Sequence, residues 1–116
     1  MEDFFDNWVV QIRKGLLELC ILNALAEKER YGYDLVKVLV STPGLGLSEG
    51  TIYPLLSRLK NSGLITSRLE ESPEGPARKY YCLTPDGRKI MRVMNDHFEE
   101  LNIGTSKLRK KAESYD

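Results

Sequence analysis

The side chains with evident chemical potential in this sequence are one histidine, two cysteines and a polar stripe between Ser48 and Lys60. His97 has no serine, cysteine or acidic pair at a recognisable catalytic spacing, so the sequence predicts no enzyme active site. Cys20 and Cys82 lie far apart, each in an apolar run, which is typical of small buried side chains in a reducing compartment. These groups do not make a complete metal shell, and we expect neither a metal nor a cofactor.

The polar stripe belongs to an expected helix whose other face is apolar. The apolar positions follow the i, i+3, i+4, i+7 pattern of a helix packed on a core, and they are Ile52, Leu55, Leu56 and Leu59. Small and hydroxyl-bearing side chains on the opposite face let a helix approach a DNA groove and offer hydrogen bonds to phosphates and base edges. An ordinary solvated helix has a similar face. The residues of this helix that we expect to contact DNA are Ser48, Gly50, Thr51, Tyr53, Ser57, Arg58 and Lys60.

A second basic segment lies where a β-hairpin is expected to return from its turn. Strands over 64–70 and 78–83 are separated by the Pro- and Gly-rich loop 71–77. Strand alternation puts Tyr81 and Leu83 on the core face of the second strand and Arg78, Tyr80 and Cys82 on the other. Basic groups beside such a wing can reach the flanking DNA backbone or the minor groove. We therefore add Arg78, Lys79 and Tyr80 to the expected DNA contacts.

The charge distribution is compatible with two classes of partner. The formal net charge is zero, but Ser48 to Arg92 holds eight Lys and Arg against five acids. DNA responds to such local potential, because charges are felt over about 8–10 Å. The acidic side chains near the wing tip, Glu70, Glu71 and Glu74, would instead repel phosphates and favour a winged helix that binds only proteins. One basic face containing Arg58, Lys60, Arg78 and Lys79 would favour DNA. A ligand carrier with a secondary role on DNA is a third hypothesis.

The elements that must position these residues can be read from the same pattern. The 116 residues suit one domain. Helices are expected over about 8–27 and 31–41, and a third begins at Ser48, whose hydroxyl should accept from the amides of the first turn, and ends at Gly63. Pro54 should loosen its first turn. After the hairpin, Thr84 should cap a long final helix with Pro85 at its first position. The expected fold class is mainly α with a small β-hairpin (α+β), a winged helix-turn-helix with a long C-terminal dimerisation helix.

The final helix has an apolar heptad that its own chain does not obviously cover. We expect the helix to pair with the first and last helices of a second copy, through interface residues Val9, Ile12, Met91, Met94, Phe98, Leu101 and Leu108. A planar effector could be held between the copies by Trp8, Met91, Met94, His97 and Phe98, although the same side chains would also suit a plain interface. Residues 1–88 would form the DNA-binding domain and 89–116 the dimerisation helix. Gly104 could end the heptad early and leave the tail frayed.

The N-terminal segment argues against export or membrane insertion. Glu2 and Asp3 are acidic, and the following helix is interrupted by Gln11, Arg13 and Lys14. The sequence therefore predicts a cytoplasmic protein without a membrane span.

Four segments together resemble the signature blocks of the PadR family of transcriptional regulators. They are Tyr31-Gly32-Tyr33-Asp34-Leu35, the block from Glu49 to Leu59, Gly63-Leu64-Ile65, and the block from Arg78 to Gly87. They occur in the family order and spacing over about residues 12–95, with a departure at Pro76-Ala77, where many relatives are richer in glycine.

The resemblance implies a homodimeric winged-helix repressor that binds an inverted repeat in double-stranded operator DNA. In many members a small aromatic or amphipathic ligand releases the DNA. The block around Tyr53 would read the major groove, and Arg78-Lys79-Tyr80 would belong to the wing.

Overall fold

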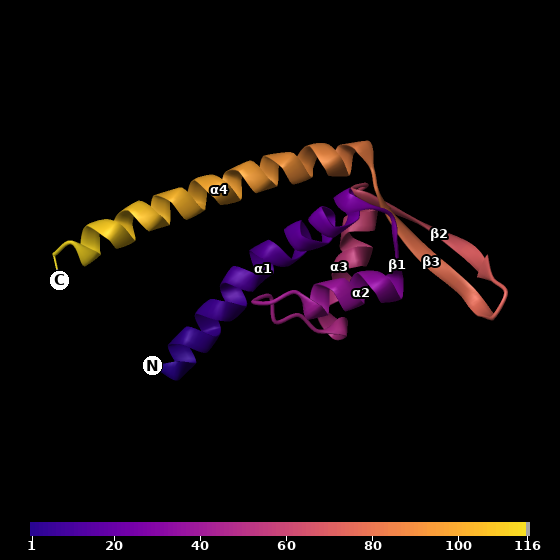
Figure 1. The fold of residues 1–116 in the computed structure, drawn as a ribbon, viewed down its shortest axis with the longest axis horizontal. Coiled ribbons are helices and arrows are strands. Elements are labelled where there is room, and N and C mark those ends of the chain that lie inside the picture. The colour runs from indigo at the N-terminus through magenta and orange to yellow at the C-terminus, as the bar shows by residue number, and fades with distance from the viewer. Residues whose placement is uncertain (116) are drawn as a thin grey trace.

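The computed structural model describes residues 1–115, and Asp116 lies outside the described residues. Within this range the chain forms four helices and three strands. In chain order they are α1 (Glu2–Glu27), β1 (Arg30–Tyr31), α2 (Gly32–Ser41), α3 (Glu49–Asn61), β2 (Ile65–Ser72), β3 (Gly75–Leu83) and α4 (Pro85–Glu113). A head of α2, α3 and the end of α1 carries the β2–β3 hairpin on one side, while α1 and α4 extend from the other (Figure 1). The predicted fold class, mainly α with a small β wing, is confirmed.

The core lies where α1, α2 and α3 meet the start of the hairpin. Its most deeply buried side chains are Ile21, Leu22, Leu35, Ile52, Leu56 and Ile65. The apolar face predicted for α3 is therefore the packed one, although Leu55 is only partly buried. Burial of each large aliphatic side chain stabilises the fold by about 1.5–3 kcal/mol, so this cluster holds α3 in a fixed orientation.

Helix α1 is longer than the sequence pattern predicts. It begins at Glu2 rather than near Trp8, and only its C-terminal half enters the core. Phe4, Phe5 and Trp8 remain exposed on the N-terminal half. Periodicity missed only residues 2–7, whose apolar side chains do not follow the stripe that packs on the head.

The sequence pattern did not predict β1. Its two residues pair antiparallel with β3, Arg30 opposite Tyr81 and Tyr31 opposite Tyr80, so the sheet order is β1-β3-β2. Two residues are too few to show a period of two. The Arg30 side chain is buried, and it donates to the Ala24 carbonyl at 3.0 Å and pairs with Glu27 at 2.6 Å. The guanidinium thus ties the end of α1 to the sheet.

The hairpin is longer than expected, and the prediction of a loop over 71–77 is wrong. Ser72 pairs with Gly75, so only Pro73 and Glu74 form the turn. The register shifts between Glu70 and Ser72, which leaves Pro76 and Ala77 opposite Glu71. Proline has no N–H to donate, and such a bulge is where a strand accommodates it.

The ends of α3 only partly match the sequence prediction. Ser48 is the N-cap residue, but its side chain does not cap an amide; its hydroxyl instead lies 2.9 Å from the Thr51 hydroxyl. The prediction of a side-chain cap is therefore wrong. At the other end Gly63 has a positive φ of 76°, and the Leu64 amide donates to the Leu59 carbonyl at 3.0 Å. This is the predicted glycine stop, a Schellman motif. The helix is continuous through Pro54.

Helix α4 begins as predicted and continues further than expected. The Gly87 amide donates to the Thr84 hydroxyl at 2.9 Å, and Pro85 occupies the first helical position. The helix runs unbroken through Gly104 to Glu113. One glycine costs a helix only about 1 kcal/mol relative to alanine, which the helix-forming residues on either side offset. The predicted domain boundary after residue 88 lies in the first turns of α4. The predicted frayed tail includes Asp116, which lies outside the described residues.

Two findings bear on classes of function. No helix in residues 1–115 is both long and apolar enough to cross a membrane. Across the same residues, His, Cys, Asp and Glu side chains do not gather in groups of three that could bind a metal ion.

Candidate nucleic-acid interface

The face of α3 opposite the core is open to solvent. Successive residues of a helix are about 100° apart, so the side opposite Ile52, Leu56 and Leu59 is formed by Gly50, Pro54, Ser57 and Asn61. All four are exposed. Gly50 has no atom within 4 Å of the position that a Cβ would take. The outermost surface of α3 is therefore narrow and built from small side chains, a shape that can enter a DNA groove.

The two flanks of this face point toward different neighbours. Thr51 and Arg58 lie on the flank nearer α1, where Arg58 pairs with Glu18 at 3.4 Å. Tyr53 lies on the other flank and lines the groove beside the hairpin. Both cations and hydroxyls are therefore available around α3, but Arg58 already has an acidic partner.

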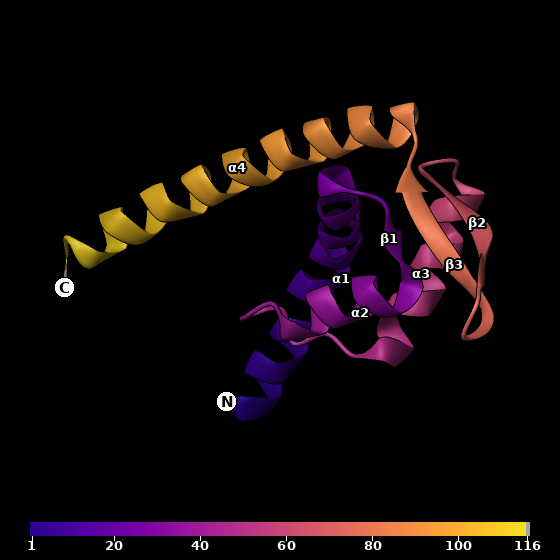
Figure 2. The same cartoon turned by 45° about the vertical axis from the view of Figure 1, so that its right-hand side comes forward.

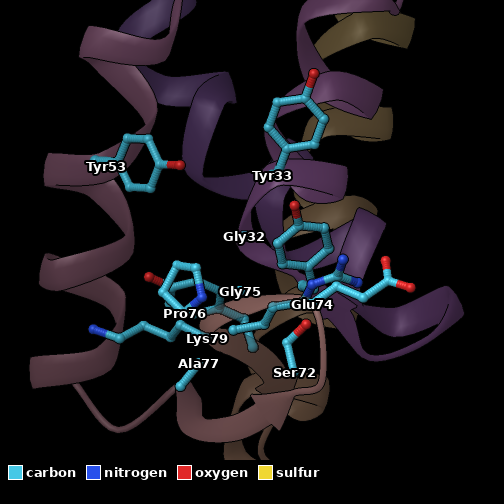
Figure 3. A pocket seen from close by; sticks show the side chains of 12 residues that line it. Gly32, Tyr33, Tyr53, Ser72, Glu74, Gly75, Pro76, Ala77 and Lys79 are labelled. Carbon is cyan, nitrogen blue, oxygen red and sulfur yellow. The ribbon is translucent and has the colours of Figure 1, made fainter.

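A groove of about 600 Å³ separates α3 from the hairpin. Its walls come from the start of α2, from α3 and from the tip of the hairpin. Figure 3 shows the Tyr53 hydroxyl turned toward α2, and Lys79 reaching from the hairpin toward α3. In the ribbon view of Figure 2, α3 lies next to the hairpin. Helix α3 thus borders this groove through Tyr53, on the flank of its open face.

The two faces of β3 divide the basic segment that the sequence treats as a unit. Tyr81 is buried, and Lys79 shares its face and lines the groove. Arg78 and Tyr80 lie on the other face, where the Arg78 guanidinium stacks 4.8 Å from the centre of the Tyr31 ring. The predicted alternation is confirmed for buried Tyr81 and exposed Arg78. Lys79 and Arg78 therefore extend from opposite faces of β3, although both border the groove.

Ion pairs occupy the outer face of the sheet. Arg68 stacks on Tyr80, with its guanidinium carbon 4.9 Å from the ring centre, and pairs with Glu29 and with Glu70. The hydrogen bonds that Arg68 donates to Glu29 and, secondly, to Glu70 raise the pKa of Arg68 above its usual value. Glu70, one of the acids that the sequence places near the wing tip, is thereby neutralised by a neighbour.

The four cations expected to form one basic face occupy different places. Arg58 pairs with Glu18, Arg78 stacks on Tyr31 at the groove, and Lys79 also lines the groove. Lys60 is exposed near the C-terminal end of α3. Arg78 and Lys79 therefore both border the groove, whereas Arg58 lies on the α1 side of α3.

A second groove, of about 710 Å³, lies between α1 and α4 and is mostly apolar. Its lining includes many of the residues predicted for a dimer interface or an effector site, namely Trp8, Ile12, Met94, His97, Phe98 and Leu101. Met91 is different, because it is 8 % exposed and belongs to the core of its own chain. Val9 is half-buried and Leu108 is exposed, and neither lines the groove. Nearer the head, Asn23 and Asn95 exchange hydrogen bonds of 3.0 and 2.8 Å that join the two helices.

Sequence reasoning missed several residues of the open face of α3 and of the groove beside the hairpin. Pro54 lies in the middle of the open face of α3, and helical periodicity alone places it opposite the packed face. Gly32 and Tyr33 come from α2 and meet Tyr53 only in the folded chain. In the sequence, Tyr31-Gly32-Tyr33 stands out only as part of a family segment, although all three residues line the groove. Cys20 and Cys82 are half-buried free thiols, and burial raises the pKa of Cys20.

Comparison with known proteins agrees with this architecture. Residues 21–93 match the transcriptional regulator PadR-like family. The transcriptional regulator Rv3488 of Mycobacterium tuberculosis is 35% identical over 91 residues, which span 78% of this chain and 83% of that protein. A PadR family transcriptional regulator from Eggerthella lenta has a similar crystal structure, with a TM-score of 0.79 and 34% identity over 92% of this chain and 93% of that one.

A transcriptional regulator from Streptococcus is also similar, with a TM-score of 0.76 and 37% identity over 85% of this chain and 97% of that one. The family match takes in α2, α3, the hairpin and the start of α4, which together carry the groove and the open helix face. Members of this family are transcriptional regulators rather than enzymes. The chain belongs to the PadR-like family of transcriptional regulators.

Proposed function

We propose that the protein is a homodimer that binds an inverted repeat in operator DNA, with α3 in the major groove and the hairpin along the adjoining backbone. The observation that carries this proposal is the open face of α3, where Gly50, Pro54 and Ser57 stand clear of the core beside a groove containing Lys79. Small residues let the helix approach the base edges, while the lysine supplies charge to the backbone.

The predicted contacts can be assigned by position. Ser48, Gly50, Thr51, Tyr53 and Ser57 would face the major groove at the exposed start and middle of α3. Lys60 and Lys79 would contact phosphates on the hairpin side. Arg58 would reach the backbone on the α1 side, and Arg78 and Tyr80 the backbone beyond the wing. Cations contribute mainly affinity that is independent of base sequence, whereas the α3 side chains discriminate among sequences.

Dimerisation is supported by apolar surface that the described residues leave uncovered. Trp8, Phe98 and Leu101 are between 41 % and 54 % exposed along the groove between α1 and α4. Pairing of these helices with a second copy would bury this surface. It would also present two α3 helices for successive major grooves, about 34–36 Å apart. In this proposal α1 and most of α4 form the interface, and the remainder of the chain binds DNA.

We extend the proposal to regulation. A dimer on a promoter would exclude polymerase and so repress, and a small aromatic compound between α1 and α4 would release it. The groove offers Trp8, Met94, His97 and Phe98, which are flat or polarisable groups suited to a planar ligand.

One observation favours a second candidate, a winged helix that binds only proteins. Arg58 and Arg68 are already paired with acids, and Glu71 and Glu74 are exposed at the wing. A partner protein with a mixed surface would tolerate these charges better than a phosphate backbone would. The two candidates differ in whether the protein selects DNA sequences.

Selection from a random duplex pool tests the proposed function. We expect a palindromic consensus, and binding of that duplex should weaken steeply with salt. Lys79→Ala should weaken binding to every sequence and reduce the slope of log K against log salt by about one, because one phosphate contact is lost. Tyr53→Ala should also relax the consensus. Fluorescence anisotropy at several salt concentrations measures these effects.

Lys111→Ala is the matched control for Lys79→Ala, since it removes an exposed lysine near the far end of α4. It should leave the affinity and its salt slope unchanged. If the selected pool shows no consensus, the protein does not bind a specific operator, and the protein-interaction candidate gains.

Trp8 provides a test of the effector site, because it is the only tryptophan in the chain. Planar aromatic compounds that bind the groove should change its fluorescence and release the selected duplex. Phe98→Ala should weaken ligand binding by about tenfold, since one aromatic pair and its buried area are lost. Ile103→Ala, on the opposite side of α4, should bind the ligand as the wild type does. Ligand release that is unaffected by Phe98→Ala would place the effector elsewhere.

A further inference from the structure

A groove of about 500 Å³ lies between α1 and the open face of α3. Leu17 is buried and Leu55 is half-buried along it, and Gly50 and Pro54 of the open face also line it. The charged side chains that line this groove are Lys14, Glu18 and Arg58. The fold therefore brings an acid of α1 to the edge of the face that we propose to enter DNA.

The two partners of the Arg58–Glu18 ion pair differ in how firmly they are held. Glu18 lies between Leu17 and Leu19, which are both buried in the core, and its side chain is 20 % exposed. The Arg58 side chain is 72 % exposed. Arg58 Nη1 lies 3.4 Å from Glu18 Oε1, beyond the roughly 2.7–3.2 Å of a good N–H···O hydrogen bond. The carboxylate is therefore fixed beside α3, whereas the guanidinium can exchange it for another anion.

A DNA phosphate is a better partner for Arg58 than this carboxylate is. Guanidinium groups often bind phosphate through two parallel hydrogen bonds of about 2.7–2.9 Å, which are shorter than the contact with Glu18. A phosphate contact also releases counterions condensed on the duplex, a gain that a protein carboxylate does not offer. Since the proposed function places Arg58 on the backbone at this flank, Glu18 and a phosphate would compete for one cation.

Lys14 offers Glu18 another cation once Arg58 leaves. It is exposed, lies about one helical turn before Glu18 on α1 and lines the same groove. Residues four apart on a helix are neighbours on its surface, where opposite charges attract. The exchange therefore does not strand the carboxylate of Glu18 without a nearby positive charge.

We propose that Glu18 competes with the DNA backbone for Arg58: it holds the guanidinium against α1 in the free protein, and DNA binding exchanges the carboxylate for a phosphate. The inference rests on the proposed function, because it requires a duplex on α3. The exchange breaks the ion pair on every duplex, so Glu18 weakens binding to selected and random DNA by a similar factor. It thus sets the affinity of the regulator without contacting DNA.

A double-mutant cycle on Glu18 and Arg58 tests the competition. We expect Glu18→Gln, which keeps the size of the side chain and removes its charge, to tighten binding of the selected duplex by about fivefold, the upper range for a partly exposed ion pair. In the Arg58→Ala background the same change should alter the affinity by less than about twofold, because the contested cation is gone. Glu113→Gln removes an exposed carboxylate at the last residue of α4 and should bind as the wild type does.

The Arg58 guanidinium provides a readout that does not depend on affinity. Its Nε–H resonance, assigned by its loss in Arg58→Ala, should differ between the free wild type and free Glu18→Gln. In the saturated complexes the two proteins should give the same resonance, because both then hold phosphate. Arg58→Ala should also reduce the slope of log K against log salt by about one. Since Arg58 is exposed, this variant serves where Glu18→Gln impairs folding.

Several results would overturn the competition. Unchanged affinity of Glu18→Gln would mean that the carboxylate does not restrain Arg58. An equal gain in the Arg58→Ala background would make Glu18 a general negative charge near DNA. Different Arg58 resonances in the two complexes, or an unchanged salt slope in Arg58→Ala, would mean that the ion pair persists on DNA. Failure of the wild type to select any duplex would instead overturn the proposed function itself.

Discussion

Leu101→Glu is expected to convert the protein to a monomer and to weaken binding of the selected duplex at least about 100-fold. A dimer engages its second half-site at a high effective concentration, and linked binding of this kind raises affinity by about 10²–10⁴. The monomer would keep α3 and its wing but lose that gain. Analytical ultracentrifugation and anisotropy with the selected duplex measure the two effects.

The location of Leu101 explains the size of this effect. The side chain is 54 % exposed and lines the apolar groove between α1 and α4. In a two-fold interface each substitution occurs twice. Each loses about 1.5–3 kcal/mol of apolar burial and brings a carboxylate into apolar surroundings. The core of the protomer is separate, so the monomer should stay folded.

Ile103→Glu is the matched control, because Ile103 is also exposed and lies only two residues along α4, on the opposite side of the helix. It should remain dimeric with wild-type affinity. A Leu101→Glu protein that stays dimeric would show that a different surface joins the copies.

Gly87→Ala is expected to destabilise the fold by about 3 kcal/mol or more, the upper range for overpacking a core. Gly87 is buried in the first turn of α4. A Cβ there would overlap the Leu64 carbonyl oxygen and lie 2.8 Å from Leu83 Cδ1. Since the obstructing atoms include backbone, relief requires α4 to move away from the hairpin.

That movement would also strain two hydrogen bonds at the start of α4. The Gly87 amide donates to the Thr84 hydroxyl at 2.9 Å, and the Thr84 amide donates to the Leu64 carbonyl at 3.1 Å. Loss of such a cap costs about 1 kcal/mol. Urea unfolding at fixed protein concentration should show a lower midpoint, because a dimer's stability depends on concentration.

Gly50→Ala is the control for Gly87→Ala. It makes the same change within a helix, where a Cβ has no neighbour within 4 Å. We expect its stability to equal or slightly exceed that of the wild type, because alanine favours helix. Wild-type stability of Gly87→Ala would mean that α4 and the hairpin are less tightly packed than this structure describes.

Local patterns were sufficient for most of the fold. The stop of α3 at Gly63 and the start of α4 at Thr84 follow from residues that act on their own backbone, and the structure has both. The core face of α3 follows from helical periodicity. Ser48 shows the limit of such inference, since its hydroxyl has a second partner in Thr51 that competes with the helix amide.

The candidate site was less accessible to sequence reasoning. Arg78 and Lys79 are adjacent in the chain, yet strand alternation sends them to opposite faces of the wing. Arg58 was expected among the DNA contacts and proves to pair with Glu18, forty positions earlier. Charge partners of this kind are brought together by helix packing, which composition does not reveal.

By itself the sequence determined the order of the elements, the packed face of α3, the family and the exposed stripe of α4, because each depends on residues within a few turns of one another. Only the tertiary structure decided which side of the wing faces α3, that β1 completes the sheet, and that Gly32, Tyr53 and Tyr81 converge. Those three residues come from α2, α3 and β3. Their meeting depends on long-range packing, and no local period records it.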